Sequence, residues 1–151
     1  MSAMTRYEEW IERLACGEQR LYIVAEVANA HEGSLEMALR MVAEVIRTGA
    51  DAIKFQCFTA NELLVPQHPK YETFRNLEMP WKDWETLIHR ASAEGLDVFC
   101  DLFGFESADR IMALEPTGFK IHLSDVPNTP LLRHIGACGR PVFLSTGGAN
   151  W

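Results

Sequence analysis

Residues 21–33, LYIVAEVANAHEG, decide the fold expected for this chain. An apolar run over 21–25 is broken by one carboxylate, Glu26, and the segment then turns through His31 to Gly33. Such a run predicts a buried strand that carries an acid to the rim of a sheet. The alternative is a plain strand end at which Glu26 meets water.

Outward from this stretch, the apolar patterns of strands and helices alternate. An amphipathic helix over 5–16 precedes the first strand, 21–27. The other predicted strands are 52–57, 97–102, 118–123 and 141–145, and the predicted helices between strands are 35–48, 80–95, 106–114 and 130–138. Five nearly continuous apolar strands alternating with four helices predict an α/β fold with a parallel sheet covered by helices.

No linker divides the chain, so residues 1–151 are predicted to be one domain, with an N-terminal helix in 1–17 and the strands in 21–151. The connection over 58–79 has no clear periodicity, and connections of this length are usually functional or flexible. A doubly wound sheet could be complete with five strands and no helix after the fifth. An eight-stranded barrel needs roughly 250 residues, so this chain would supply a little over half of that ring.

Composition excludes several functions. The 151 residues are 48% hydrophobic and carry 14 Lys+Arg against 21 Asp+Glu, a formal net charge of −7. With no basic block, nucleic acid and anionic membranes are not expected partners. Neither a signal peptide nor a membrane span is apparent, which predicts a cytoplasmic protein. The four cysteines form no CxxC pair, so neither a zinc site nor disulfides are expected.

Polar residues near the ends of the strands fall on one predicted face. Because side chains alternate along a strand, Glu26, Lys54, Lys120 and Ser145 share the face opposite the apolar one. Catalytic residues of barrel enzymes lie at the carboxyl ends of the strands, so we interpret this convergence as a site. A lone strand lysine more often extends to solvent, which is the alternative for each residue taken singly.

Two neighbouring lysines repel each other unless an anion lies between them, so their expected ligand is a phosphate or a carboxylate. Phosphoenolpyruvate carries both groups. The segment Ser145-Thr146-Gly147-Gly148 adds a hydroxyl and backbone N–H groups that can form an anion-binding nest, although a Gly-Gly turn is common by itself.

Four segments in order, AEVANAHEGSLEMA, GADAIKFQ, FKIHLSDVPNTPLL and GRPVFLSTGG, resemble the N-terminal half of the sialic acid synthase family. The resemblance runs from about residue 21 to the end. It implies a (β/α)8 TIM barrel, of which this chain holds the first five strands and four helices. It also implies a transferase that condenses phosphoenolpyruvate with N-acetylmannosamine or a related N-acyl aminosugar, forms a nine-carbon sugar acid and releases phosphate.

The same resemblance implies roles for individual residues. Glu26 becomes the catalytic carboxylate. The residues expected to bind substrate are Lys54, Gln56, Asp101, Lys120, His122, Ser145 and Thr146. A divalent metal, Mn²⁺ or Mg²⁺, is implied for the full-length enzyme. The family's metal-binding histidines lie in the other half of the barrel, so no metal ligand is assigned in this chain, and His31 is read as a loop residue that orders the rim of the first strand.

Three departures from the family pattern indicate a divergent branch. Asp101 stands where a small hydroxyl residue is usual, and a carboxylate there would repel phosphate unless it is protonated or paired with a lysine or metal. Leu123 replaces a serine, although Ser124 is adjacent, and the asparagine before His31 is displaced to Asn29.

Three functions stay open at this point. The isolated 151 residues are expected to be inactive, as the N-terminal part of a synthase that acts on small-molecule substrates. A non-catalytic anion-binding or assembly domain derived from such a synthase is the second reading. The third is another phosphate-handling aldolase-type barrel, which would need a Schiff-base lysine. His122 could contact substrate or be a core histidine, and a homo-oligomer is not excluded.

Overall fold

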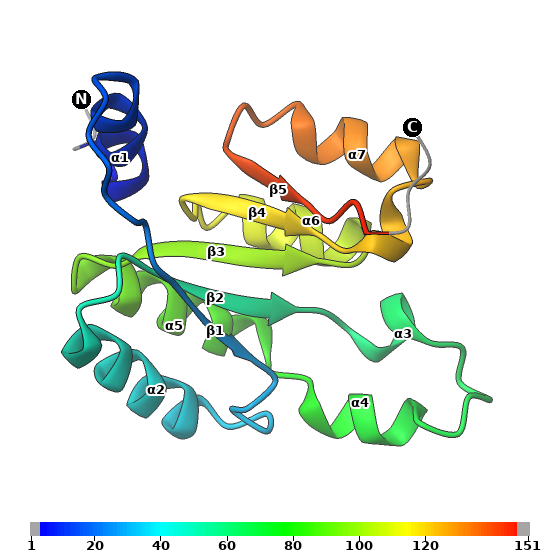
Figure 1. The fold of residues 1–151 in the computed structure, drawn as a ribbon. Helices are drawn as coiled ribbons and strands as arrows, with labels where there is room; N and C mark the ends of the chain where they lie inside the picture. The colour runs from blue at the N-terminus through cyan, green and yellow to red at the C-terminus, as the bar shows by residue number, and fades with distance from the viewer. Residues whose placement is uncertain (1–3, 148–151) are drawn as a thin grey trace.

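Five parallel strands form one sheet in the order in which they follow along the chain, β1-β2-β3-β4-β5, in a computed structural model that describes residues 4–147 (Figure 1). The strands are β1 (Val24–Ala28), β2 (Ala52–Cys57), β3 (Asp97–Leu102), β4 (Gly118–Ile121) and β5 (Val142–Leu144). All five predicted strands are therefore present. Three are shorter than predicted: β1 begins at Val24, β4 ends at Ile121, and β5 loses a residue at each end.

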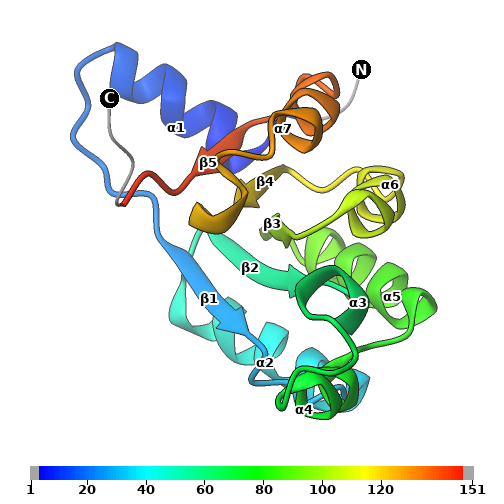
Figure 2. The same ribbon diagram turned by 90° about the vertical axis from the view of Figure 1, so that its right-hand side faces the viewer.

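The helices are α1 (Arg6–Ala15), α2 (Leu35–Thr48), α3 (Ala60–Leu63), α4 (Tyr71–Leu77), α5 (Trp81–Ala93), α6 (Phe105–Met112) and α7 (Thr129–Gly136), with a 3-10 turn, η1 (Leu123–Asp125). Figure 2 shows the strands as an arc, with α2, α5, α6 and α7 on its outer side. A doubly wound sheet reverses its strand order and carries helices on both faces. Sequential order with these helices on one face is instead the wall of a barrel.

The outer face of the sheet and the helices against it make the core. Alternate strand residues that point outward are fully buried, namely Ile53, Phe55, Val98, Cys100, Phe119 and Ile121. They pack with helix residues that include Trp84, Leu87, Ile88, Ile111 and Leu131. The alternation predicted an apolar outer face, and this prediction is confirmed. All four cysteines are free thiols, and burial raises the pKa of the Cys57 thiol well above its usual value.

The connection between β2 and α5 is not the irregular loop that its sequence suggested, because it contains α3 and α4. Side chains tie these short helices to the rest of the fold. Glu62 in α3 accepts a hydrogen bond from the backbone N–H of Ser107 at 2.9 Å, in the first turn of α6. Glu78, after α4, accepts one from the N–H of Ala60 at 2.5 Å. Contacts distant in sequence stabilise these helices, which periodicity does not reveal.

Helix α1, the amphipathic helix predicted before the first strand, covers the amino-terminal end of the strands. Asp97, the first residue of β3, accepts hydrogen bonds from the N–H groups of Arg6 and Tyr7 at 3.2 and 2.6 Å and from the Tyr22 hydroxyl at 2.6 Å. The Tyr7 ring meets Phe99 edge-on at 5.8 Å between centroids. Aromatic rings therefore close the inner face at the amino-terminal end of the strands, so the site must lie nearer their carboxyl ends.

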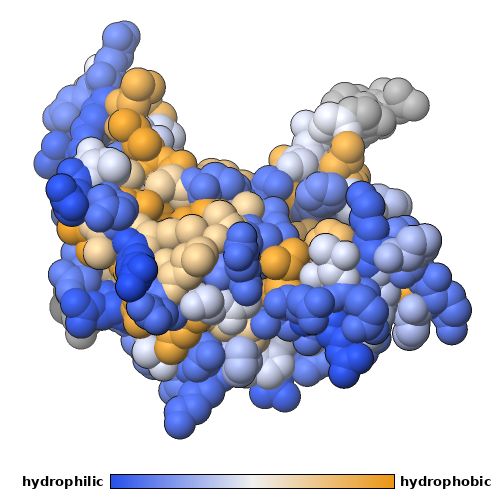
Figure 3. Space-filling model, turned by 90° about the horizontal axis from the view of Figure 1, so that it is seen from below, coloured by the Kyte–Doolittle hydropathy of each residue, from blue (hydrophilic) through white to orange (hydrophobic). Residues whose placement is uncertain are grey.

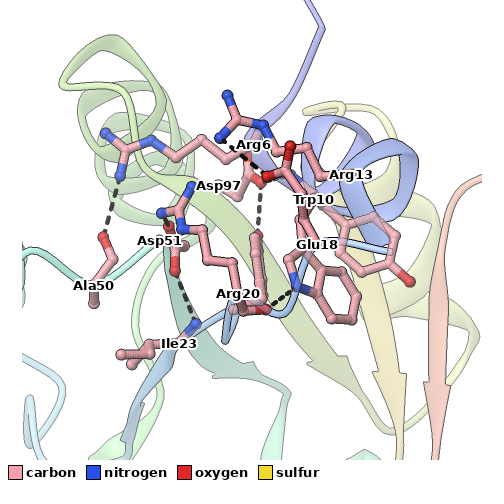
Figure 4. A network of polar contacts seen from close by, with 11 residues as sticks. Arg6, Trp10, Arg13, Glu18, Arg20, Ile23, Ala50, Asp51 and Asp97 are labelled. Atoms are coloured by element: carbon pink, nitrogen blue, oxygen red, sulfur yellow. Dashed lines mark hydrogen bonds and ion pairs between the residues drawn. The ribbon is translucent and has the colours of Figure 1, made fainter. Parts of the chain in front are cut away.

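A second buried carboxylate at this end fixes the start of β1. Asp51 pairs with Arg20 and accepts a hydrogen bond from the N–H of Ile23 at 2.9 Å. The Trp10 indole N–H donates to the carbonyl of Arg20 at 2.7 Å. Figure 4 shows this network between α1 and the strand starts. These polar contacts, together with the aromatic packing of Tyr7 and Trp10 against Tyr22, hold α1 to the start of β1.

Both edges of the sheet carry exposed apolar side chains. Just before β1 these are Leu21 and Ile23, and on β5 they are Val142 and Leu144; α1 adds Ile11 and Leu14. In Figure 3, apolar surface gathers at the left, on the side where α1 lies in Figure 1. Within residues 4–147, β1 and β5 each pair with one strand only. Across that same range, every helix is too short or too polar to traverse a lipid bilayer.

Candidate functional site

One ammonium group joins two carboxylates on the inner face of the sheet. The Lys54 Nζ lies 2.9 Å from both carboxylate oxygens of Asp101 and forms an ion pair with Glu26. The side chains of Lys54 and Asp101 are 11% and 3% exposed, whereas that of Glu26 is 46% exposed. We call Glu26, Lys54 and Asp101 the Lys54 cluster, which is buried on one side and open to solvent on the other.

The strand register explains how the Lys54 cluster forms. Glu26 in β1 lies directly beside Lys54 in β2, and Lys54 lies beside Phe99 in β3. Asp101 is two residues beyond Phe99, so it is the diagonal neighbour of Lys54 on the same face, within reach of a long side chain. The cluster therefore follows from side-chain alternation on three adjacent parallel strands.

A bulge fixes Glu26 at the end of β1. The register shifts between Glu26 and Ala28, and Ala28 has a positive φ of 49°. Its backbone N–H donates to a Glu26 carboxylate oxygen at 3.1 Å. Bulges of this kind end regular pairing and re-aim a side chain. The carboxylate is thereby turned back toward Lys54.

The charge on Lys54 is well stabilised. Burial by itself lowers the pKa of this amine, but the hydrogen bonds and charges of Glu26 and Asp101 outweigh burial and raise the pKa above its usual value. Lys54 is therefore an ammonium ion at neutral pH. It cannot act as a neutral amine nucleophile here, which argues against Lys54 as a Schiff-base lysine.

Lys120 and Gln56 flank Asp101 in the sheet. Gln56 is the β2 neighbour of Asp101, and Lys120 is its β4 neighbour. Both residues are half-buried. No carboxylate among residues 4–147 forms an ion pair with Lys120. The inner face thus carries one ammonium that is paired twice and one that is available to a ligand.

The other predicted contacts lie at the ends of β4 and β5. His122 is exposed, and its Nδ1 lies 3.0 Å from the Ser124 hydroxyl, so it is not a core histidine and bonds within its own turn. The N–H of Ser145 donates to the carbonyl of Ile121 at 3.1 Å, continuing the ladder past β5, and Thr146 beyond it is exposed. Gly148, the last part of the predicted nest, is outside the described residues. Only Glu26, Lys54 and Asp101 are brought into direct contact.

His31 lies in the loop after β1, as predicted, but it is fully buried. Its Nδ1 accepts a hydrogen bond from the N–H of Gly33 at 3.1 Å, and its ring meets Trp84 edge-on at 5.4 Å. Burial lowers its pKa below the usual value. Its role is packing behind the sheet, away from the inner face. Trp84 itself is buried in the core.

Pairing of Asp101 with a lysine was one of the alternatives that the sequence left open, and the structure shows Lys54 as the partner. Alternation along β3 places Asp97, Phe99 and Asp101 on the face that bears Lys54. A carboxylate beside phosphate appeared unfavourable unless it was paired, and the structure shows that it is paired with a lysine. Among the described residues, no three His, Cys, Asp or Glu side chains are grouped so as to hold a metal ion, so no step through a metal is derived for them.

Comparison with known proteins agrees with this architecture. The model of the NeuB family matches residues 41–151. Pseudaminic acid synthase of Campylobacter jejuni is 27% identical over 144 residues, which cover 86% of this chain and 42% of that protein. N-acetylneuraminate-9-phosphate synthase of Homo sapiens is 28% identical over 146 residues, which cover 87% and 40%.

A solved structure shows the same fold. N-acetylneuraminic acid (sialic acid) synthetase of Leptospira borgpetersenii, in complex with citrate, superposes with a TM-score of 0.81 at 27% identity over 87% of this chain and 46% of that one. The chain thus spans about two fifths of the two relatives' length and has a TIM-barrel type of fold. The resemblance inferred from the four motifs is confirmed: most of the chain matches the family model, and the chain belongs to the NeuB family.

Proposed function

We propose that this chain supplies the first part of the active site of a sugar acid synthase. The reaction would condense phosphoenolpyruvate with an N-acyl aminosugar, N-acetylmannosamine or a related sugar, to a nine-carbon 2-keto acid. The observation that best supports it is the Lys54 cluster beside Lys120, on the inner face near the carboxyl ends of the strands. Barrel enzymes build their active sites at this end.

The chemistry assigns a role to each group. The methylene carbon of phosphoenolpyruvate bonds to the aldehyde carbon of the sugar, and the aldehyde oxygen takes up a proton to become a hydroxyl. Water adds to the carbon that bears the phosphate, and the C–O bond to phosphate then breaks, which leaves the keto group. Glu26, the exposed member of the cluster, would take the proton of that water. Lys120, with the turn after β5, would hold the phosphate as its charge grows on departure. Lys54 would orient Glu26.

The whole reaction needs more than these residues. A divalent metal, Mn²⁺ or Mg²⁺, would have its ligands outside residues 4–147, because the described side chains form no metal-binding group. We therefore expect the 151-residue chain to bind phosphoenolpyruvate without turnover, and a longer cytoplasmic protein of the same family to complete the reaction.

Binding of phosphoenolpyruvate tests the proposal. Calorimetric titration of the 151-residue protein, with Mn²⁺ present, should detect binding that Lys120→Ala weakens by about tenfold, because a charge-assisted contact is lost. Lys82→Ala on the exposed surface of α5 removes the same charge elsewhere and should leave the affinity unchanged. Equal affinity in all three proteins would contradict the proposal.

Turnover tests the role of Glu26. In a longer protein that contains these residues, Glu26→Gln should abolish release of phosphate and change the affinity for phosphoenolpyruvate little, since the general base is lost while the lysines stay. Near-normal turnover by this variant would show that the assignment of Glu26 is wrong.

A non-catalytic anion-binding or assembly domain is the second candidate. The double pairing of Lys54 favours it, because among the lysines of the inner face in residues 4–147 only Lys120 is left to attract an anion. Binding of phosphoenolpyruvate by the longer protein, with no turnover of any aminosugar, would support this candidate over the synthase.

A further inference from the structure

The Lys54 ammonium has no hydrogen left for a ligand. An ammonium group donates at most three hydrogen bonds. Both oxygens of Asp101 lie 2.9 Å from Nζ, and Glu26 forms an ion pair with the same atom. An anion that approached Lys54 would have to displace one of these two carboxylates.

Asp101 is the carboxylate that would resist displacement. Its side chain is 3% exposed, whereas that of Glu26 is 46% exposed. A buried carboxylate without its counterion is strongly destabilised, since its charge is no longer compensated. Glu26 can instead turn to water. Asp101 therefore keeps its place beside Lys54 when a ligand arrives.

This fixed charge lies next to the available lysine. Asp101 and Lys120 are direct neighbours across β3 and β4. An anion bound at Lys120 would also be repelled by the negative charge of Asp101. This repulsion is twice as large for a ligand with two negative charges as for a ligand with one. The charges of the two carboxylates of the Lys54 cluster and of the two lysines sum to zero, so these four groups together offer no net positive charge to a dianion.

We propose that Asp101 is a specificity-determining residue, which lowers the affinity of the inner face for dianionic, phosphate-type groups relative to monoanionic groups. This inference rests on the proposed function insofar as the inner face binds an anion. It adds that the anion affinity is set by a carboxylate on β3 as well as by the lysines. Removal of the Asp101 charge frees Lys54 and removes the repulsion together.

The test compares two tetrahedral anions of different charge. Inorganic phosphate and methanesulfonate are titrated at about pH 8 into the 151-residue protein and into Asp101→Asn, with NMR shifts of backbone amides as the readout. Asp101→Asn should bind phosphate at least about tenfold more tightly than the unaltered protein, and its gain for methanesulfonate should be about threefold or less. Asp109→Asn, an exposed residue of α6, makes the same charge change away from the inner face and should alter neither affinity.

Two further measurements test the inference even if the Asp101→Asn variant does not fold. Asp101→Ser leaves a smaller side chain and should show the same preference for phosphate if the Asn variant does not fold. The unaltered protein should bind phosphate no more tightly than methanesulfonate. Tighter binding of phosphate by the unaltered protein, or equal gains for both anions on loss of Asp101, would overturn the inference.

The same titrations separate this inference from the synthase proposal. If phosphoenolpyruvate binds no more tightly than inorganic phosphate and Lys120→Ala has no effect on it, the proposed function fails. A selective gain for phosphate in Asp101→Asn would still support the role of Asp101 in that case.

Discussion

His31 makes stability depend on pH, because it is buried as the neutral imidazole. Burial lowers its pKa below the ordinary value of about 6.5. Just below that pH, His31 is therefore protonated in the unfolded chain but stays neutral in the folded chain. The unfolding free energy should therefore fall as the pH drops below about 6.5, by up to about 1.4 kcal/mol per pH unit until the folded pKa is reached. Urea unfolding at a series of pH values measures this slope.

A matched pair of histidine variants isolates the contribution of His31. His31→Gln should flatten the slope below about pH 6.5, whereas His89→Gln, on the exposed surface of α5, should leave the slope as it is. The role given to His31 would be wrong if both variants kept the full slope.

For single residues, the sequence predicts which face of a strand a side chain lies on, but not which other side chains it contacts. Alternation along β1, β2 and β4 placed Glu26, Lys54 and Lys120 on one face, because a period of two follows from the backbone alone. The burial of His31 could not be predicted, since a loop residue has no period. Which groups touch depends on register between strands, so the contact of Lys54 with Asp101 needed coordinates.

Helix α1 depends on one carboxylate for its attachment to the sheet. Asp97 binds the first two N–H groups of α1 and the Tyr22 hydroxyl, and burial together with Asp97 raises the Tyr22 pKa far above its usual range. Asp97→Asn keeps the shape but removes the charge and one acceptor. We expect it to lower the unfolding free energy by about 2–3 kcal/mol.

Chemical denaturation and limited proteolysis measure this effect. Cleavage near residues 17–20 should become faster in Asp97→Asn, because α1 is released from the strand starts before the sheet unfolds. Glu18→Gln changes an exposed acid next to α1 and should match the unaltered protein in both assays. An unchanged denaturation midpoint for Asp97→Asn would exclude Asp97 as the attachment.

Elements differ in how far their sequences determine them. Helices α2 and α5 bury a regular apolar stripe, so their spacing predicted them. Helices α3 and α4 have four and seven residues, too short to be stable alone or to show a period. They exist because of contacts such as that of Glu62 with Ser107, 45 residues away. Sequence patterns contain no direct record of such distant pairs.

The two exposed edges of the sheet are expected to determine whether the molecule associates with itself. Ile23 near β1 is 55% exposed and Leu144 on β5 is 42% exposed, and each edge strand offers unpaired backbone groups. Exposed apolar edges favour pairing with another chain. We therefore expect the 151-residue protein to associate with itself reversibly as its concentration rises, which sedimentation velocity would detect.

Lysine substitutions on both edges should reverse that association. A lysine on an edge strand places a charge that another chain would have to bury, so Ile23→Lys combined with Leu144→Lys should shift the protein toward monomer at equal concentration. Met37→Lys makes the same kind of change on a helix, α2, and not on an edge strand, at a side chain that is 38% exposed. If Met37→Lys dissociated the protein as well as the edge pair did, association would run through general surface hydrophobicity. Because the inner face lies between the two edges, a contact specific to them would also limit access to Lys120, and the same double variant should then bind anions faster than the unaltered protein does.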